Sequence, residues 1–486
     1  MKITTRILLS AAALLISTAT FAQSGHAEQL RASYEGKQAK YIFLFIGDGM
    51  GMAHVNAAEA FVAAGKNNIT MNTLNMSGFE VQSFMTTYSQ DRFITGSAAS
   101  GTAIATGHKT TTGTISMDSD HKKNYKTIAE KAKDNGYKVG ILTSVPINHA
   151  TPAVFYAHVP VRHNYYSIGK QLPLSGFDFF GGGAFQDPTG KKDDKQSLIA
   201  FAEEHGYTYL DNKREIKRLS PDDGPVIAVN PNTSEGAMPY AIDMTREDIP
   251  LADFTGKAIE MLDNDEGFFM MVEGGKIDWA GHDNDAASIV YDMMDFDNAV
   301  GEAMDFYKNH PDETLIIVTS DHETGGMSVG SRSAKYSSFY ERLENQKISK
   351  WRFSALVDEK SKAGEFSYET AMEMAKKYFG LGKKFNGFEL TEDDHRLLKH
   401  AYGVEFGSKE RRASLDAMAV SYTGDHPFSL QVVMLVNEKS GLSFTTNSHT
   451  AQAVPVKVQG AGASLFSTYL DNTDISKMID VLLIKR

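Results

Sequence analysis

The sequence predicts an α/β fold: a doubly wound, mostly parallel central sheet with helices on both faces and an inserted cap or crown region. Apolar runs such as 42–46 do not alternate with polar residues, as expected for strands buried on both faces. These runs alternate along the chain with segments of helical character. They also end at carboxylates or histidines, at the edge where open α/β sheets collect ligands.

The expected elements follow one another without a Pro/Gly/Ser-rich linker or a low-complexity tract. In chain order they are a strand at 42–46, a helix after 51, a helix at 126–135, a strand at 138–144, a helix at 253–264, a strand at 267–273, a helix at 285–308 and a strand at 314–320. We therefore expect one catalytic domain over residues 23–486, although its length exceeds the usual domain size of about 150 residues.

A polar, aromatic-containing stretch at about 330–443 interrupts this pattern. Because it falls between two candidate ligands, His322 and His449, we expect an insertion into the catalytic domain. Helices at 368–378 and 391–401 would build a cap or crown beside the site. The alternative is a solvated surface excursion with no role in substrate choice.

Residues 1–22 have the pattern of a signal peptide: a charged start, an apolar run at 7–16 and small residues ending at Ala22. The apolar run is shorter than the about 20 residues that span a bilayer, so we expect no stable membrane anchor. The absence of cysteine excludes disulfides and thiolate zinc sites. These features predict an exported bacterial protein, either periplasmic or secreted.

The net charge of −12 comes with no nucleic-acid-binding signature, so affinity for an anion has to come from a local field. The sequence does not set the oligomeric state, and a homodimer is one candidate.

Four expected strands end in groups that bind metals. Asp48 lies between two glycines after 42–46, Glu273 ends the strand at 267–273, Asp321 and His322 follow the strand at 314–320, and a short strand is expected to end at His449 (444–449). Asp278 and His282 are four residues apart, so they share one face if a helix begins there. The candidate ligands are Asp48, Glu273, Asp278, His282, Asp321, His322 and His449. Carboxylates and imidazoles without thiolates suit Zn²⁺ at a catalytic site.

The candidate nucleophile is Ser97, in a run of small residues that favours a tightly packed helix. At a helix N-terminus, the macrodipole and free N–H groups favour both an alkoxide and a bound phosphate. No Gly-x-Ser-x-Gly elbow or general-base histidine lies nearby in the sequence, so activation has to come from a metal.

The chain resembles the alkaline phosphatases over almost all of its length after the leader, through motifs that occur in the family's order. The motifs are Phe45-Ile-Gly-Asp48-Gly-Met-Gly, Ser97-Ala-Ala-Ser, Thr106-Gly-His-Lys-Thr, His149-Ala-Thr151-Pro-Ala, Ala157-His-Val-Pro-Val-Arg162, Val272-Glu273-Gly-Gly-Lys-Ile-Asp278-Trp-Ala-Gly-His282, Thr319-Ser-Asp321-His322-Glu-Thr-Gly-Gly and Ser448-His449-Thr.

The resemblance implies two zinc ions and a third, magnesium-type ion. The first zinc would be held by Asp278, His282 and His449, and the second by Asp48, Asp321 and His322 together with Ser97 Oγ. The third site would be built on Asp48, Thr151 and Glu273. Arg162 would grip two phosphate oxygens, for which a guanidinium is well shaped.

The implied function is hydrolysis of small phosphate monoesters through a phosphoserine on Ser97, by in-line displacement between two metals. Three divalent cations would outweigh the four carboxylates and leave a site that suits a phosphate dianion. A phosphodiesterase of the same superfamily and a metal-stabilised, non-catalytic binding protein are the alternatives. A sulfatase is excluded because the segment around Ser97 lacks the C/S-x-P-x-R setting.

Three positions depart from a common pattern of the family. Gly96 stands where many members have an Asp that orients the arginine, so Arg162 is expected to be freer. His149 and Trp279 stand where a variant of the pattern has Asp and Lys. We therefore expect the third site to bind Mg²⁺ weakly and to accept Zn²⁺, with Trp279 as an uncharged wall.

Overall fold

The computed structural model describes residues 29–484 apart from 30–31, 67, 72, 384–386 and 408–425. The expected signal peptide at 1–22 lies outside the described residues. Of the helices that are described, none combines the length and the apolar character needed to cross a bilayer.

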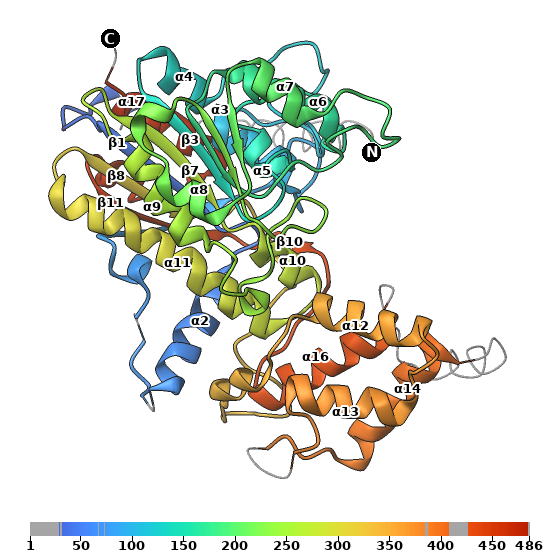
Figure 1. Cartoon of the computed structure of the whole chain (residues 1–486). Helices are drawn as coiled ribbons and strands as arrows, with labels where there is room; N and C mark the ends of the chain where they lie inside the picture. Colours follow the sequence, from blue (N-terminus) through green and yellow to red (C-terminus); the bar gives the residue numbers. More distant parts are fainter. Residues whose placement is uncertain are drawn as a thin grey trace, which may run out of the picture.

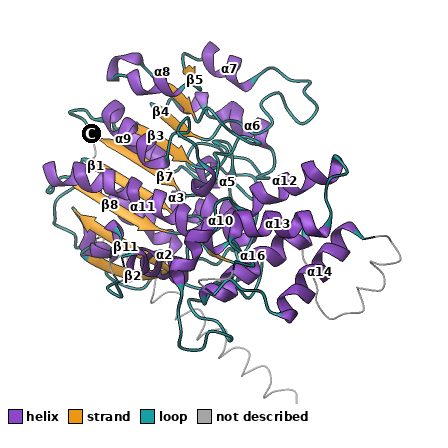
Figure 2. Ribbon diagram, turned by 60° about the horizontal axis from the view of Figure 1, so that its bottom comes forward, coloured by secondary structure: helices purple, strands orange, loops and turns teal. Residues whose placement is uncertain are grey.

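Within the described residues, ten strands form one twisted sheet in the order β12-β2-β11-β8-β1-β7-β3-β4-β6-β5 (Figures 1 and 2). From β8 to β5 every neighbouring pair is parallel, whereas β11 runs antiparallel to both β8 and β2. This confirms the predicted mostly parallel sheet and adds a mixed edge. The strands are β1 Tyr41–Ile46, β2 Val81–Thr86, β3 Lys138–Thr143, β4 Phe179–Gly182, β5 Thr208–Leu210, β6 Val226–Val229, β7 Phe268–Glu273, β8 Thr314–Thr319, β11 Val454–Gly460 and β12 Leu470–Asp471.

Helices cover both faces of the sheet, as the fold class predicts (Figure 2). The described helices are α2 Met52–Gly65, α3 Ser97–Thr106, α4 Ile128–Asp134, α5 Ala150–Ala153, α6 Tyr165–Gln171, α7 Leu198–Glu204, α8 Lys213–Arg218, α9 Leu251–Leu262, α10 Lys276–His282, α11 Ala286–Asn309, α12 Lys350–Lys362, α13 Tyr368–Phe379, α14 Glu392–Phe406, α16 Pro427–Ser440 and α17 Asn472–Leu482. The elements expected from sequence shift by one or two residues, except that α14 extends five residues further.

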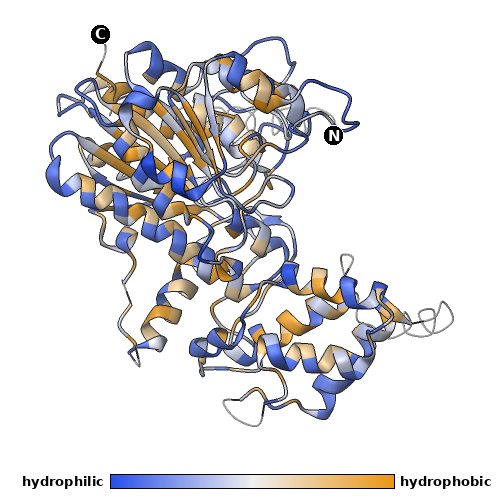
Figure 3. Cartoon of the chain, in the orientation of Figure 1, coloured by the Kyte–Doolittle hydropathy of each residue, from blue (hydrophilic) through white to orange (hydrophobic). Residues whose placement is uncertain are grey.

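The central strand β1 shows why both faces need helices. All six of its residues are buried, and successive side chains point to opposite faces. Phe43 and Phe45 belong to the core packed with α2, α9 and α11, while Leu44 belongs to the core packed with α3, α4 and α17. Apolar residues accordingly concentrate on the central strands (Figure 3).

Four helices, α12, α13, α14 and α16, form a group beside the sheet that we call the helical unit (Figure 1). At its base, the short antiparallel pair β9 Glu323–Thr324 and β10 His449–Thr450 joins the outgoing and returning chain. A further bridge links Ser328 to Ser443. The chain therefore comes back to the point that it left.

The predicted strand at 444–449 is wrong. Residues 444–448 form no strand and bend at 445, 447 and 448, and the N–H groups of Thr445 and Thr446 both donate to the Gly325 carbonyl at 3.2 Å. Strand β10 begins only at His449, which pairs with Thr324. His449 thus lies at the start of a strand and not at its end.

Candidate active site

Parallel pairing brings the first carboxylates together. Ile46 at the end of β1 lies in register with Glu273 of β7 and with Thr319 of β8. Asp48 and Asp321 follow these strand ends by two residues and are fully buried, as is Glu273. Three acidic side chains therefore share one edge of the sheet, as the sequence predicted.

One candidate metal group consists of Asp48, Asp321 and His322, whose ligand atoms all lie within 4.8 Å of one another. His322 Nε2 lies 3.4 Å from Asp48 Oδ1 and 3.3 Å from Asp321 Oδ2. Both of these carboxylate oxygens are buried without a hydrogen-bond partner. Because a buried, unsatisfied carboxylate oxygen is costly, the group is built for a cation.

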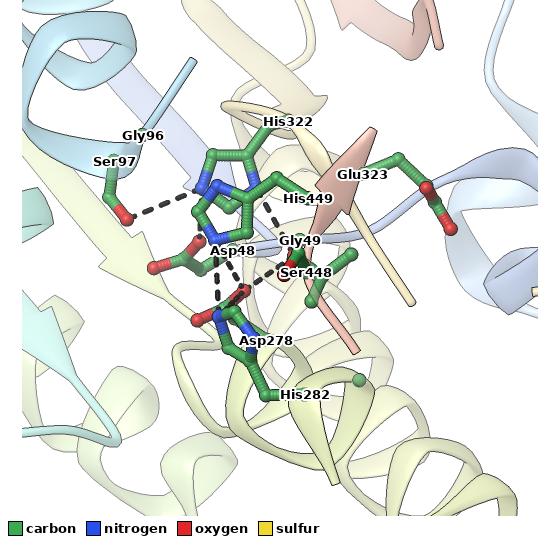
Figure 4. Close-up of polar contacts among 12 residues, drawn as sticks. Asp48, Gly49, Gly96, Ser97, Asp278, His282, His322, Glu323, Ser448 and His449 are labelled. Atoms are coloured by element: carbon green, nitrogen blue, oxygen red, sulfur yellow. Dashed lines mark hydrogen bonds and ion pairs between the residues drawn. The ribbon is translucent and has the colours of Figure 1, made fainter. Parts of the chain in front are cut away.

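A second group consists of Asp278, His322 and His449, again within 4.8 Å (Figure 4). The family resemblance implies His282, and not His322, for this set. His282 lies next to it, with Nε2 3.1 Å from His449 Nε2 and 3.5 Å from Asp278 Oδ1. The helix α10 presents Asp278 and His282 one turn apart, as their spacing predicted.

Backbone carbonyls orient two of the imidazoles. His449 Nδ1 lies 2.8 Å from the Thr95 carbonyl, and His282 Nδ1 lies 2.7 Å from the Asn447 carbonyl. Because a carbonyl only accepts, each Nδ1 carries a hydrogen, and Nε2 is the ring nitrogen left to face a cation. Burial lowers the pKa of His449 and keeps that ring neutral. Two imidazole Nε2 atoms that face each other at 3.1 Å fit a bound cation between them.

Ser97 is the first residue of α3 and is 2 % exposed. Its Oγ lies 3.3 Å from His322 Nε2 (Figure 4). Arg162 Nη1 donates to the same oxygen at 3.5 Å. The hydroxyl is therefore placed between the candidate metal group of Asp48 and a guanidinium.

Glu273, Thr151 and Asp48, from which the family resemblance implies a third site, lie next to this group. Thr151 Oγ1 donates to Asp48 Oδ2 at 3.3 Å, and Thr143 Oγ1 donates to Glu273 Oε2. The other carboxylate oxygen, Glu273 Oε1, is buried without a hydrogen-bond partner. The oxygen-rich set suits a hard cation such as Mg²⁺.

Arg162 is not left free by the absence of a carboxylate at Gly96. Its Nη2 lies 3.1 Å from His149 Nε2. Burial, and then the nearby Arg162 charge, hold the pKa of His149 well below its usual range. The neutral imidazole can therefore accept the guanidinium N–H. Trp279 stands beside His149, with ring centroids 6.0 Å apart in an edge contact.

Sequence reasoning missed the threonines that hold the ligands. Thr324 Oγ1 donates to Asp278 Oδ1 at 2.5 Å and also lies 3.3 Å from His322 Nδ1. Thr143 holds Glu273. Thr324 lies only two residues after His322, and its place in that motif was the available signal.

The fold and the site define a class, a metal-dependent hydrolytic enzyme with a serine beside its metal groups. A family model described as "Alkaline phosphatase" matches residues 39–484. Alkaline phosphatase 3 of Bacillus subtilis is 31% identical over 458 residues, covering 91% of this chain and 88% of that protein.

Solved structures agree with this assignment. A cold-active alkaline phosphatase from a psychrophilic Shewanella has a TM-score of 0.74 at 27% identity, covering 92% of this chain and 100% of that one. A variant of the alkaline phosphatase from the Antarctic bacterium TAB5, with a histidine replaced by aspartate and Mg bound in its M3 site, has a TM-score of 0.63 at 25% identity, covering 93% and 100%. The chain belongs to the alkaline phosphatase family, and it is a phosphomonoesterase.

Buried carboxylates make the metal-free protein sensitive to pH. Burial, with its neighbouring charges, raises the pKa of Glu273 to about 8 and that of Asp321 to about 7, from 4.5 and 3.8. Between about pH 4 and 8 the unfolded chain has therefore lost protons that the folded chain keeps. Raising the pH through this window lowers the free energy of unfolding, and bound cations remove the effect.

We predict that the melting temperature of chelator-treated protein falls from pH 5 to pH 8, so that its gap to metal-loaded protein widens. Thermal unfolding at several pH values measures both. Glu273→Gln flattens the metal-free curve, and the exposed Glu203→Gln serves as a matched control that leaves it unchanged. Parallel curves with and without metal would contradict the prediction.

Proposed function

We propose that the protein hydrolyses phosphate monoesters through a phosphoserine on Ser97, with two zinc ions and one magnesium-type ion in the site. The single observation that carries this proposal is the position of Ser97 Oγ, 3.3 Å from His322 Nε2 and 3.5 Å from Arg162 Nη1. His322 belongs to both candidate metal groups, so the hydroxyl lies where the two groups meet.

Each cation has a set of residues to hold it. Asp278, His282 and His449 would hold one zinc, and Asp48, Asp321 and His322 the other. The third ion would be held by Asp48, Thr151 and Glu273. When bound, such ions lower the pKa of a coordinated hydroxyl and stabilise negative charge on attacking and leaving oxygens.

The residues of the chain then divide the work. Arg162 binds phosphate oxygens and orients the ester toward Ser97. Ser97 Oγ gives up its proton and forms a bond to phosphorus as the bond to the alcohol oxygen breaks, and the alcohol leaves with a proton. Water then attacks the phosphoserine from the vacated side. The bond from phosphorus to Ser97 Oγ breaks, Oγ regains a proton, and phosphate is released.

Two alternatives remain for comparison. A phosphodiesterase would share the metal ligands but would gain less from Arg162, because a diester carries one negative charge fewer. A metal-stabilised binding protein would not turn over a phosphate ester at all. The experiments on Ser97 and Arg162 below separate these cases.

We also propose that residues 1–22 direct export and are removed, and that the segment at about 330–443 is an insertion that caps the site. The path of the chain supports the second proposal. The chain leaves the site after His322, forms the helical unit and returns to the site at His449. Assembly as a homodimer stays a prediction.

We predict that Ser97→Ala abolishes the covalent intermediate and most of the rate of p-nitrophenyl phosphate hydrolysis, because no other group can form the phosphoserine. Trapping with labelled phosphate at acidic pH, followed by peptide mapping, should place the label on Ser97. Ser100→Ala is the matched control. It removes a nearby hydroxyl that donates to the Asp321 carbonyl and is not the proposed nucleophile, so the label should still appear on Ser97. A label on any other residue contradicts the mechanism.

For Arg162→Ala we predict a tenfold to hundredfold loss of kcat/KM for monoesters, because a charge-assisted hydrogen bond contributes about 1.5–3 kcal/mol. Diester turnover should fall less. Arg162→Lys keeps the charge without the planar fork and should lie between the two. An equal loss of kcat/KM for monoesters and diesters would indicate a structural role for Arg162 and would favour the phosphodiesterase alternative.

The third site should bind Mg²⁺ weakly and accept Zn²⁺, because an imidazole stands where a carboxylate would hold the waters of Mg²⁺. The Mg-bound TAB5 variant, in which aspartate replaces a histidine, supports this proposal for His149. We predict that His149→Asp binds Mg²⁺ at least tenfold more tightly than the wild type does, whereas His149→Asn does not. Calorimetric titration measures the affinity without relying on activity, and equal affinities in all three proteins would refute the idea.

A further inference from the structure

A cavity of about 770 Å³ lies between the loop 231–248, helix α10 and the start of α12 in the helical unit. The chain contains two tryptophans, Trp279 and Trp351, and both line this cavity. None of the proposed zinc or magnesium ligands lines it. The cavity is therefore separate from the metal groups, although α10 contributes to both.

One wall of the cavity carries two aromatic rings, Tyr240 and Trp279, that lie against the same lysine. Lys276 Nζ lies 3.8 Å from the ring centroid of Tyr240 and 4.3 Å from that of Trp279. Lys276 is 5 % exposed, so its charge is held against both rings away from water. The two rings are thus packed against one buried cation.

The wall that α12 contributes carries Trp351, which is 47 % exposed in the first turn of that helix. Hydrogen bonds tie the start of this helix to the sheet domain. Ser349 donates through Oγ and N to Asp243, at 2.5 and 2.9 Å, and Lys350 Nζ pairs with Asp283 Oδ1 at 2.6 Å. Both walls are therefore held in place in the folded protein.

A chain of side-chain contacts links the cavity to Ser97. Trp279 contacts His149, His149 contacts Arg162, and Arg162 reaches Ser97. A phosphate held by Arg162 therefore lies two contacts from the ring of Trp279. Ligand sites of about 300–1,000 Å³ hold drug-sized groups, so this cavity is large enough for a nucleoside.

The charges at the cavity indicate the character of its ligand. Its lining carries three basic residues and four acidic ones: Lys276, Lys347, Arg352, Glu235, Asp243, Glu247 and Asp248. Because both signs are present, neither a strongly cationic nor a strongly anionic group gains from the cavity as a whole. Planar, uncharged aromatic rings gain most, since they can stack on tryptophan without losing hydration of a charge.

Resting on the proposed function, we propose that this cavity binds the alcohol part of the phosphate monoester, and that the favoured alcohols are of nucleoside size and carry a neutral aromatic ring. Such an ester would place its phosphate at Ser97 and its ring between Trp279 and Trp351. Binding energy from the remote ring would then contribute to selection among phosphate monoesters.

Kinetics with two substrates tests the proposal. We predict that Trp351→Ala lowers the ratio of kcat/KM for adenosine 5′-monophosphate to that for glycerol phosphate by roughly tenfold, mainly through KM of the nucleotide. Trp351→Phe, which keeps a stacking ring, should retain most of the ratio. Tyr336→Ala removes an exposed aromatic ring that does not line the cavity and should leave the ratio unchanged.

A binding measurement without catalysis separates this inference from the proposed function. Since both tryptophans line the cavity, adenosine should quench the intrinsic fluorescence of the metal-loaded protein excited at wavelengths selective for tryptophan, and glycerol should not. Absence of quenching, or an equal loss for both substrates in Trp351→Ala, overturns the subsite and leaves the phosphomonoesterase intact. If Ser97→Ala keeps full activity while adenosine still quenches, the proposed mechanism fails and the ring site stands.

Discussion

Repulsion among buried carboxylates is the constraint on which the rest of the structure depends. Burial raises the pKa of Asp48 well above its usual range, and the charges of Asp321 and Asp278 raise it further. A parallel sheet makes this concentration unavoidable, because adjacent strands in register end at the same edge. Cations are the natural solution, and the imidazoles and threonines around the carboxylates are arranged to accept them.

Much of this site could be predicted from the sequence because it depends on local signals. An apolar run that stops at Asp48 between two glycines, or at Asp321 and His322, marks a strand end without further information. The spacing of Asp278 and His282 similarly required only the helical period. For these residues, the parallel register converts separate motifs into one cluster.

Features that depend on contacts between distant segments could not be predicted. The antiparallel strand β11 pairs with β8 through residues about 140 positions apart in the sequence, and the sequence of neither strand predicts this pairing. His322 was assigned to one metal, whereas its ring stacks on His449 at 3.6 Å and shares the ligand group of Asp278. The bends before His449 also broke an expected strand, because carbonyl partners such as Gly325 lie far away in sequence.

The pairing of β9 with β10 has a consequence for how this protein can diverge. Closing a longer loop costs only about 0.6 kcal/mol for each doubling of its length. The two-residue pairing of β9 with β10 fixes His449 against Thr324. The geometry of the metal ligands therefore does not depend on the length of the segment between β9 and β10. Descendants of this sequence can lengthen, shorten or exchange the intervening helices without moving the metal ligands. On the proposed role of Trp351, such changes would alter the preference for the alcohol part of the ester and leave the reaction at phosphorus unchanged.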